Sequence, residues 1–400
     1  MSRIVVVGAG QAGSSLVFKL RNLGFDGDVT LIGSEPVAPY QRPPLSKKYL
    51  LGDMPLDRLY LRPPESYADL NIDLRLGATV TDVDAATQTI TVDGEQLSYD
   101  ELALTTGSAP RILPAAIGGT LDGVFAVRTL ADVDAMAPAF AQGGHVLIIG
   151  GGYIGLEAAA VAATKGLQVT LVEMADRILQ RVASTETSDY FRALHTQHGV
   201  TIHEGIGLDR LTGDTAVNGA VLSDGSTLDI DFAIVGVGIT PETALADAAG
   251  VTLNNGIETD AQGRTSDAHI WAAGDCASFP FQGGRIRLES VPNAIDQAEI
   301  VAENMLGAGK NYCAKPWFWS DQYDVKLQIA GLNAGYDQVV VRDGGASRSH
   351  WYYQAGKLIA VDAMNDPRGY MIAKRVIEAG KSVPADAAAD PMADLKAFMA

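Results

Sequence analysis

The stretch IVVVGAGQAG, residues 4–13, decides the fold, because a β-branched run there leads directly into three closely spaced glycines. These are Gly8, Gly10 and Gly13, spaced as G-x-G-x-x-G, and the later run VTLIGSE ends in a carboxylate, Glu35. A buried strand, a glycine turn, a helix and a second strand ending in an acidic residue form a dinucleotide-binding unit. Its glycines let the backbone approach a pyrophosphate at the helix N-terminus, and the carboxylate accepts hydrogen bonds from the ribose hydroxyls.

The same pattern occurs a second time, in HVLIIGGGYIG at residues 145–155. Its glycines are Gly150, Gly152 and Gly155, and the following strand VTLVE ends at Glu173. One glycine fingerprint is weak evidence, since glycines that merely permit a tight turn give the same pattern. Two copies, each between a strand and a helix and each followed by a carboxylate, predict two bound dinucleotides.

The organisation of the chain indicates an internal duplication followed by a smaller domain. Each fingerprint is followed by an apolar strand that ends in glycine, at residues 101–107 and 232–238. From Trp317 onward, aromatic residues and short strands lead to a helix at residues 370–378. We therefore predict an α/β protein with two Rossmann-like dinucleotide-binding domains and a C-terminal α+β domain.

The composition narrows the possible partners and the compartment. Hydrophobic residues make up 47% and charged residues 20%, as in a soluble globular protein, and a net charge of −18 argues against nucleic acid. No apolar run approaches the roughly 20 residues of a membrane span, and a strand at the N-terminus leaves no room for a signal peptide. The two cysteines, Cys276 and Cys313, fit a reducing compartment. We predict a cytoplasmic protein that binds neither membrane nor nucleic acid.

Motifs along the whole chain resemble the FAD-dependent ferredoxin reductases of oxygenase systems. They are, in order, GAGQAG, PYQRPPLSK, TTGSAPR, GGGYIGLE, VGVGITP, WAAGDCA, ESVPNAIDQA and PWFWSDQYD. PPLSK and PWFWSDQYD are far more specific than a glycine loop. This family, which includes putidaredoxin reductase and the reductases of aromatic-ring dioxygenases, implies a glutathione-reductase-like fold. Its domains would be residues 1–112 with 242–316 for FAD, residues 113–241 for NAD and residues 317–400 at the C-terminus.

The resemblance implies a set of FAD contacts. They are Gly8, Gly10, Gly13, Glu35, Arg42, Lys47, Arg111, Asp275, Val291 and Trp319. Asp275 follows a glycine at the tip of a strand, where ligands bind in open α/β sheets, although it could instead cap a following helix. Trp317, by contrast, is expected in the core of the C-terminal domain.

A second set is implied for the pyridine nucleotide. It comprises Gly150, Gly152, Tyr153, Ile154, Gly155, Glu157, Glu173 and Gly238. A carboxylate at Glu173, about 4 Å from the 2′-phosphate of NADP, would cost roughly 2 to 8 kcal/mol in repulsion. Arg177 and Arg181 follow and could soften this preference, but we predict NADH as the cofactor.

Lys47 and Glu157 are expected to form a catalytic pair. In the family, the PPLSK lysine pairs with a glutamate on the first helix of the NAD domain, near the flavin N5. A buried ion pair fixes the lysine, whose charge supports the flavin as it becomes anionic. The alternative is a purely structural salt bridge between domains.

The cysteines indicate how electrons leave. Disulfide-reducing relatives carry a redox cysteine in the segment after Glu35, whereas residues 36–51 contain none. Electrons must therefore pass from the flavin to an external acceptor, which the resemblance identifies as a [2Fe–2S] ferredoxin. A rubredoxin is the alternative acceptor, and a non-turnover redox sensor binding both nucleotides is the alternative function.

Two further groups of residues bear on metal binding and on partner docking. His195, His198 and His203 have a spacing that could suggest a metal site, but no carboxylate or cysteine completes it, so we predict solvated histidines and no metal. Where family members often carry a basic residue near the docking face, this chain has Glu299. An acidic partner is then expected to dock on other cations, namely Arg285, Arg287, Arg348, Lys374 and Arg375.

Overall fold

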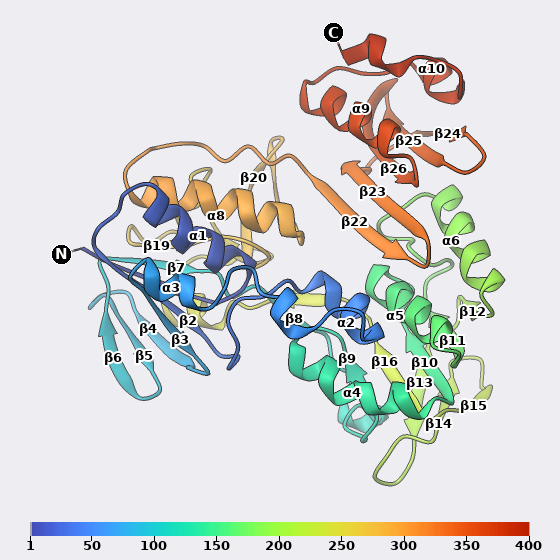
Figure 1. Ribbon diagram of the computed structural model, residues 1–400, viewed down its shortest axis with the longest axis horizontal. Helices are drawn as coiled ribbons and strands as arrows, with labels where there is room; N and C mark the ends of the chain where they lie inside the picture. The colour runs from blue at the N-terminus through green and yellow to red at the C-terminus, as the bar shows by residue number, and fades with distance from the viewer. Residues whose placement is uncertain (1, 400) are drawn as a thin grey trace. The chain divides into compact units, whose positions relative to one another are not determined.

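The computed structural model describes residues 2–399, and the chain divides into two compact units (Figure 1). Unit 1 comprises Met1–Gln41, Leu56–Ala109 and Ile239–Pro316. Unit 2 comprises Arg42–Pro55, Pro110–Gly238 and Trp317–Ala400. Each unit contains one glycine fingerprint. The predicted domains are divided by the nucleotide that each part binds, whereas these units are divided by their internal packing. The predicted domain boundaries therefore stay a prediction.

Unit 1 is built on a five-stranded parallel sheet in the order β19-β7-β1-β2-β3. Its strands are β1 (Arg3–Val7), β2 (Asp28–Gly33), β3 (Ile72–Leu76), β7 (Glu101–Leu104) and β19 (Ile270–Ala272). The β1 sequence RIVVV is apolar almost throughout because a parallel strand is covered on both faces. Helices α1 (Gln11–Asn22) and α8 (Val291–Met305) lie side by side and share a core cluster with β1 and β2 (Figure 1).

Smaller elements complete unit 1. They are α3 (Glu65–Asp69), α7 (Ala244–Ala248), the 3₁₀ turn η2 (Leu56–Arg58), the meander β4 (Val80–Asp84), β5 (Thr89–Val92) and β6 (Glu95–Ser98), and the strands β18 (Ile257–Glu258), β20 (Ala277–Phe281) and β21 (Gly284–Ile286). The short strands β8 (Ser108–Pro110) and β17 (Ile239–Pro241) lie where the chain changes unit.

Unit 2 repeats the parallel design, with strand order β12-β11-β10-β16-β9. The strands are β9 (Val124–Ala126), β10 (His145–Ile149), β11 (Gln168–Glu173), β12 (Thr201–Glu204) and β16 (Phe232–Val235). Its other elements are α2 (Lys48–Leu51), α4 (Leu130–Gln142), α5 (Tyr153–Thr164), α6 (Thr185–Gln197), the 3₁₀ turns η1 (Pro43–Ser46) and η3 (Ala115–Ile117), and the meander β13 (Leu208–Thr212), β14 (Gly219–Leu222) and β15 (Thr227–Asp229).

The C-terminal part of unit 2 is an antiparallel sheet in the order β22-β23-β26-β25-β24. It consists of β22 (Trp317–Gln322), β23 (Val325–Gly331), β24 (Gln338–Asp343), β25 (Arg348–Gln354) and β26 (Lys357–Met364), followed by α9 (Pro367–Glu378), α10 (Ala385–Ala389) and η4 (Leu395–Met399). The predicted fold class, two parallel dinucleotide-binding sheets and a C-terminal α+β part, is confirmed. Within residues 2–399 no helix has the length and apolarity needed to cross a membrane.

Candidate functional site

In the first fingerprint, the three glycine positions differ in what an added side chain would meet. Gly8 has φ +116°, and a Cβ there would lie 2.2 Å from the Thr105 carbonyl oxygen. A Cβ at Gly13 would lie 2.1 Å from the Gly8 carbonyl oxygen. A Cβ at Gly10, however, meets no described atom within 4 Å. Gly8 and Gly13 therefore permit close packing of the turn and helix, while Gly10 faces open space.

The second fingerprint has the same division of roles. Gly150 has φ +106°, and a Cβ there would lie 2.4 Å from the Gly236 carbonyl oxygen. A Cβ at Gly155 would lie 2.1 Å from the Gly150 carbonyl oxygen, whereas one at Gly152 meets nothing within 4 Å in residues 2–399. The two loops thus reproduce one design, in which the middle glycine leaves room for a group above the helix N-terminus.

The helices that begin at these loops carry no side-chain cap. Gly10 precedes α1 and Gly152 precedes α5, and in the described chain neither N-terminus receives a capping hydrogen bond from its N-cap side chain. Four other helices are capped in that way, by Thr129, Ser184, Ser290 and Asp366. The first amides of α1 and α5 are therefore available to an anion, and the positive ends of the helix dipoles favour one. Both loops fit a dinucleotide pyrophosphate.

The two ribose carboxylates lie at the ends of the second strands. Glu35 follows β2 and accepts a hydrogen bond from the Tyr40 hydroxyl at 2.6 Å. Glu173 ends β11, and its two oxygens accept from the amides of Gly151 at 2.7 Å and Ala175 at 2.8 Å. Each carboxylate oxygen has two lone pairs, so the two bonds to Glu173 leave that carboxylate able to accept from hydroxyl groups as well. Glu173 also holds the glycine loop in place, a second role that its sequence position did not reveal.

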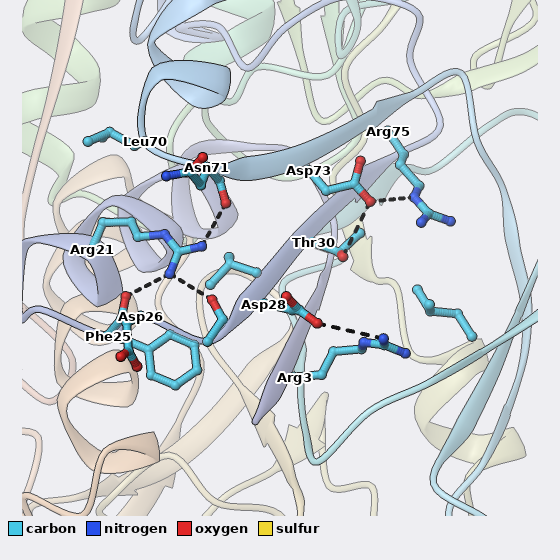
Figure 2. Close-up of a pocket in the computed structure, with 13 residues that line it drawn as sticks. Arg3, Arg21, Phe25, Asp26, Asp28, Thr30, Leu70, Asn71, Asp73 and Arg75 are labelled. Carbon is cyan, nitrogen blue, oxygen red and sulfur yellow. Dashed lines mark hydrogen bonds and ion pairs between the residues drawn. The ribbon is translucent and has the colours of Figure 1, made fainter. Parts of the chain in front are cut away.

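A cavity of about 470 Å³ lies at the opposite edge of the unit 1 sheet (Figure 2). The starts of β1, β2 and β3 line it, whereas dinucleotides bind at the carboxyl ends of such strands. Its cations are already engaged, with Arg3 paired to Asp28 at 3.6 Å and Arg75 to Asp73 at 2.8 Å. The Arg3–Asp28 pair joins β1 to β2 and the Arg75–Asp73 pair lies within β3, so both arginines already have partners and we assign no ligand to this cavity.

Three side chains converge on Glu157 inside unit 2. Its Oε2 accepts from the Lys47 ammonium and from the Ser46 hydroxyl, both at 2.7 Å, and its Oε1 accepts from the Ser320 hydroxyl at 2.6 Å. The Glu157 side chain is 4% exposed and that of Lys47 14% exposed. The pair is therefore largely desolvated and satisfied by neutral hydroxyls, which is the condition under which a buried ion pair is tolerated.

Strand alternation explains how β22 delivers Ser320. Side chains on a strand alternate between faces, so Phe318, Ser320 and Gln322 share one face. That face packs on α5, where the Phe318 ring lies 5.0 Å from the Tyr153 ring, centroid to centroid. Trp319 is on the other face, 5.6 Å from Trp317. Trp317 packs against the core of the C-terminal part, as expected.

The remaining predicted contacts are distributed over both units. In unit 2, Arg42 donates to the Arg128 carbonyl oxygen at 2.7 Å, and the Arg111 amide donates to the carbonyl oxygen of Gly238 at 2.9 Å. Ile154 is exposed in the first turn of α5.

In unit 1, Asp275 accepts from the Ser108 hydroxyl at 3.2 Å, and Val291 is the first residue of α8. The alternative role of Asp275 as a helix cap is wrong, because the strand β20 follows it.

The prediction of solvated histidines is wrong for His195. Its side chain is fully buried on α6 and bonds through Nε2 to Gln322 Oε1 at 2.8 Å and through Nδ1 to the Tyr323 hydroxyl at 3.2 Å. Desolvation lowers the pKa of His195 to about 4. Phe191, one turn earlier, is buried on the same helix face, a spacing from which the burial could have been inferred. Sequence reasoning also missed Ser46, Ser320 and Gln322.

The expected docking cations are mostly occupied. Arg285 pairs with Glu258 at 3.2 Å and donates to the carbonyl oxygens of Thr259 at 2.8 Å and Ser278 at 2.7 Å, so it holds the β20 region together. Further ion pairs join Arg287 to Glu289, Arg348 to Asp343, Lys374 to Glu378 and Lys19 to Glu299. Four of the five expected cations thus have an acidic partner that offsets their positive charge, and docking at these positions stays a prediction.

The burial of His195 predicts a specific acid sensitivity. Because its folded pKa is about 4 and an unfolded histidine titrates near 6.5, the unfolded chain binds more protons between these values and stability falls as pH falls. At pH 5 this destabilisation is about 2 kcal/mol relative to pH 7. Urea unfolding at pH 7 and pH 5 measures how much unfolding free energy each protein loses on acidification. For His195→Gln this loss should be smaller than for the wild type by that amount. An equal loss in both proteins would mean that His195 titrates normally.

Comparisons with known proteins bear on the whole chain. The family model described as pyridine nucleotide-disulphide oxidoreductase matches residues 2–298, and a reductase C-terminal model matches residues 317–399. Rhodocoxin reductase from Rhodococcus erythropolis is 40% identical, covering 99% of this chain and 94% of that protein. A ferredoxin–NAD(P)⁺ reductase from Sphingomonas sp. is 43% identical, covering 99% and 97%. A crystal structure of the covalent putidaredoxin reductase–putidaredoxin complex superimposes with a TM-score of 0.95 at 38% identity, covering 100% of this chain and 98% of that one.

Proposed function

This chain belongs to the pyridine nucleotide-disulphide oxidoreductase family, and from that membership we propose that it is a cytoplasmic, FAD-dependent NADH:ferredoxin reductase serving an oxygenase. The observation that carries the proposal is the duplicated phosphate-binding loop, here called a cradle. In each copy the middle glycine, Gly10 or Gly152, leaves open space above helix amides that no N-cap side chain occupies. Two such cradles suit an enzyme that holds FAD and a pyridine nucleotide together. The named relatives support ferredoxin as the electron acceptor.

The chain's own residues divide between the two nucleotides. In unit 1, α1 and Glu35 would hold the pyrophosphate and ribose of FAD, and in unit 2, α5 and Glu173 would hold those of NADH. The negative charge of Glu173 disfavours the 2′-phosphate of NADPH. From the resemblance alone we keep a further set of proposed FAD contacts. This set is Arg42, Lys47, Arg111, Asp275, Val291 and Trp319.

Lys47 and Glu157 are the proposed catalytic pair. Bound FAD supplies the conversion of a two-electron hydride into single electrons. Glu157 holds the Lys47 ammonium in one orientation at a largely water-excluded position, where a fixed positive charge stabilises developing negative charge more strongly than it would in water.

The cysteines do not provide an internal electron acceptor. Cys276 is buried, burial raises the pKa of its thiol, and Cys313 is exposed, both being free. A dithiol–disulfide relay needs two cysteines close together, and the segment after Glu35 has none. Electrons are therefore proposed to leave to a separate [2Fe–2S] protein.

Anaerobic addition of NADH to the purified protein tests the proposal. We expect a yellow protein with one non-covalent FAD per chain, which NADH bleaches and which then reduces a [2Fe–2S] ferredoxin coupled to cytochrome c. A colourless protein that FAD does not reconstitute contradicts the flavoprotein assignment. Transfer to rubredoxin but not to ferredoxin would replace the acceptor and keep the rest.

A further inference from the structure

A continuous line of hydrogen bonds runs from the buried Glu157 on α5, through β22 and His195 of α6, to Tyr323 in the turn after β22. Ser320 donates to Glu157 at 2.6 Å, and Gln322 Nε2 donates to the Ser320 hydroxyl at 3.2 Å. Gln322 Oε1 lies 2.8 Å from His195 Nε2, and His195 Nδ1 lies 3.2 Å from the Tyr323 hydroxyl. The line joins α5, β22 and α6, three elements of unit 2.

The carboxylate at one end fixes the direction of every bond. Glu157, ion-paired with Lys47, only accepts, so the single hydroxyl proton of Ser320 must point to it. Ser320 must then accept from the amide NH₂ of Gln322, which turns the Gln322 carbonyl toward His195. His195 must donate from Nε2, and its Nδ1 is left to accept from Tyr323. All four bonds point toward Glu157.

Burial makes this line rigid and electrostatically effective. Ser320, Gln322 and His195 are each at most 1% exposed, so none of them exchanges its partner for water at low cost. A lowered pKa keeps His195 neutral near pH 7, as the tautomer argument requires. Hydrogen bonds aligned head to tail polarise one another, and here the positive ends all face the carboxylate.

We propose that Tyr323, His195, Gln322 and Ser320 form a positioning relay that fixes the carboxylate of Glu157, and through it the ammonium of Lys47. The inference rests on the proposed function, in which Lys47 and Glu157 act in flavin reduction. Three members come from the C-terminal strand and turn, so the C-terminal part contributes to the geometry of the catalytic pair as well as to the fold.

A matched pair of variants at His195 tests the relay in the flavin-loaded enzyme. His195→Gln keeps an N–H donor near the position of Nε2, whereas His195→Met has similar length and no donor. In stopped-flow reduction by NADH, His195→Met should lower the limiting rate constant about three- to tenfold, the value of one net hydrogen bond, with the NADH Kd unchanged. His195→Gln should stay within about twofold. His198→Gln, next to Tyr323 but outside the line, is the control and should match the wild type.

Two further measurements keep the proposal falsifiable. Ser320→Ala breaks the last link without touching His195, and it should slow reduction about tenfold while Ser320→Thr restores it. Long-range ¹H–¹⁵N spectra of histidine-labelled protein should show His195 as the neutral Nε2–H tautomer, independently of any turnover. The Nδ1–H tautomer, or equal rates in His195→Met, His195→Gln and the wild type, overturns the relay. Failure of NADH to reduce the wild-type flavin overturns the proposed function instead, and the tautomer result still decides the hydrogen-bond line.

Discussion

Replacing Gly155 by alanine should strongly lower the urea concentration at which the protein unfolds. The same change at Gly152 should leave the fold intact and weaken NADH binding. The two variants add the same methyl group three residues apart. At Gly155 the new Cβ would lie 2.1 Å from the Gly150 carbonyl oxygen, so strand β10 and helix α5 must separate. We expect a loss of about 3 kcal/mol in the free energy of unfolding.

At Gly152 the methyl meets no atom within 4 Å in the part of the chain that is described, and the backbone there is extended, with φ −80° and ψ 179°. Stability should change by less than about 1 kcal/mol, the scale of an N-cap substitution. The methyl would instead occupy the space proposed for the NADH pyrophosphate, and the NADH Kd should rise at least about tenfold.

Urea unfolding and NADH titration of both variants measure these effects, with retained FAD reporting on unit 1. The interpretation fails if the Gly152 variant binds NADH normally, or if both variants lose stability equally.

Replacing Glu173 should reverse or relax the preference for NADH. A carboxylate about 4 Å from a phosphate of charge near −2 is disfavoured by at least about 2 kcal/mol even in water, which corresponds to about 30-fold in relative affinity. Glu173→Arg replaces that repulsion with attraction, so the ratio of kcat/KM for NADH over NADPH should fall by more than this factor.

The structure adds a second effect at Glu173, because its oxygens accept from the amides of Gly151 and Ala175. Glu173→Arg leaves both amides without that partner and should raise KM for both nucleotides. Glu173→Gln is the matched control, since it removes the charge and keeps a carbonyl oxygen. It should relax the preference with a smaller rise in KM for NADH. Equal use of NADPH by the unmodified enzyme would show that Glu173 does not set the preference.

The parts of this protein that could be predicted from sequence are those encoded by local spacing. A turn such as Gly8 to Gly13 and the carboxylate at the end of the next strand lie within one βαβ unit, so neighbouring residues determine their geometry. The pairing of Lys47 with Glu157 came from resemblance to a family, and the structure shows the contact at 2.7 Å.

The supporting residues lay beyond such reasoning. Ser320 contacts Glu157 directly, and Gln322 and His195 follow it in a chain of hydrogen bonds. These residues come from segments far apart in the sequence, and the number of residues between two segments does not predict which of their side chains come into contact. The signals were present but weak, namely the two-residue period of Phe318, Ser320 and Gln322 and the four-residue step from Phe191 to His195. Polar residues on a helix usually face solvent, and this general tendency gives the wrong prediction for His195, which is buried.

The Ser320 hydroxyl that β22 presents to Glu157, and the Gln322 amide that donates to that hydroxyl, bear on protein engineering. Reductases of this kind invite recombination, in which the C-terminal part of one enzyme is grafted onto the nucleotide-binding part of another to redirect electrons to a new carrier. Here such a graft made at Trp317 would carry away Ser320 and Gln322 but leave His195 behind. A chimera would need compatible residues at all three positions. A junction at Trp317, where the domain boundary is evident in the sequence, therefore separates residues that are hydrogen-bonded to one another in the folded protein.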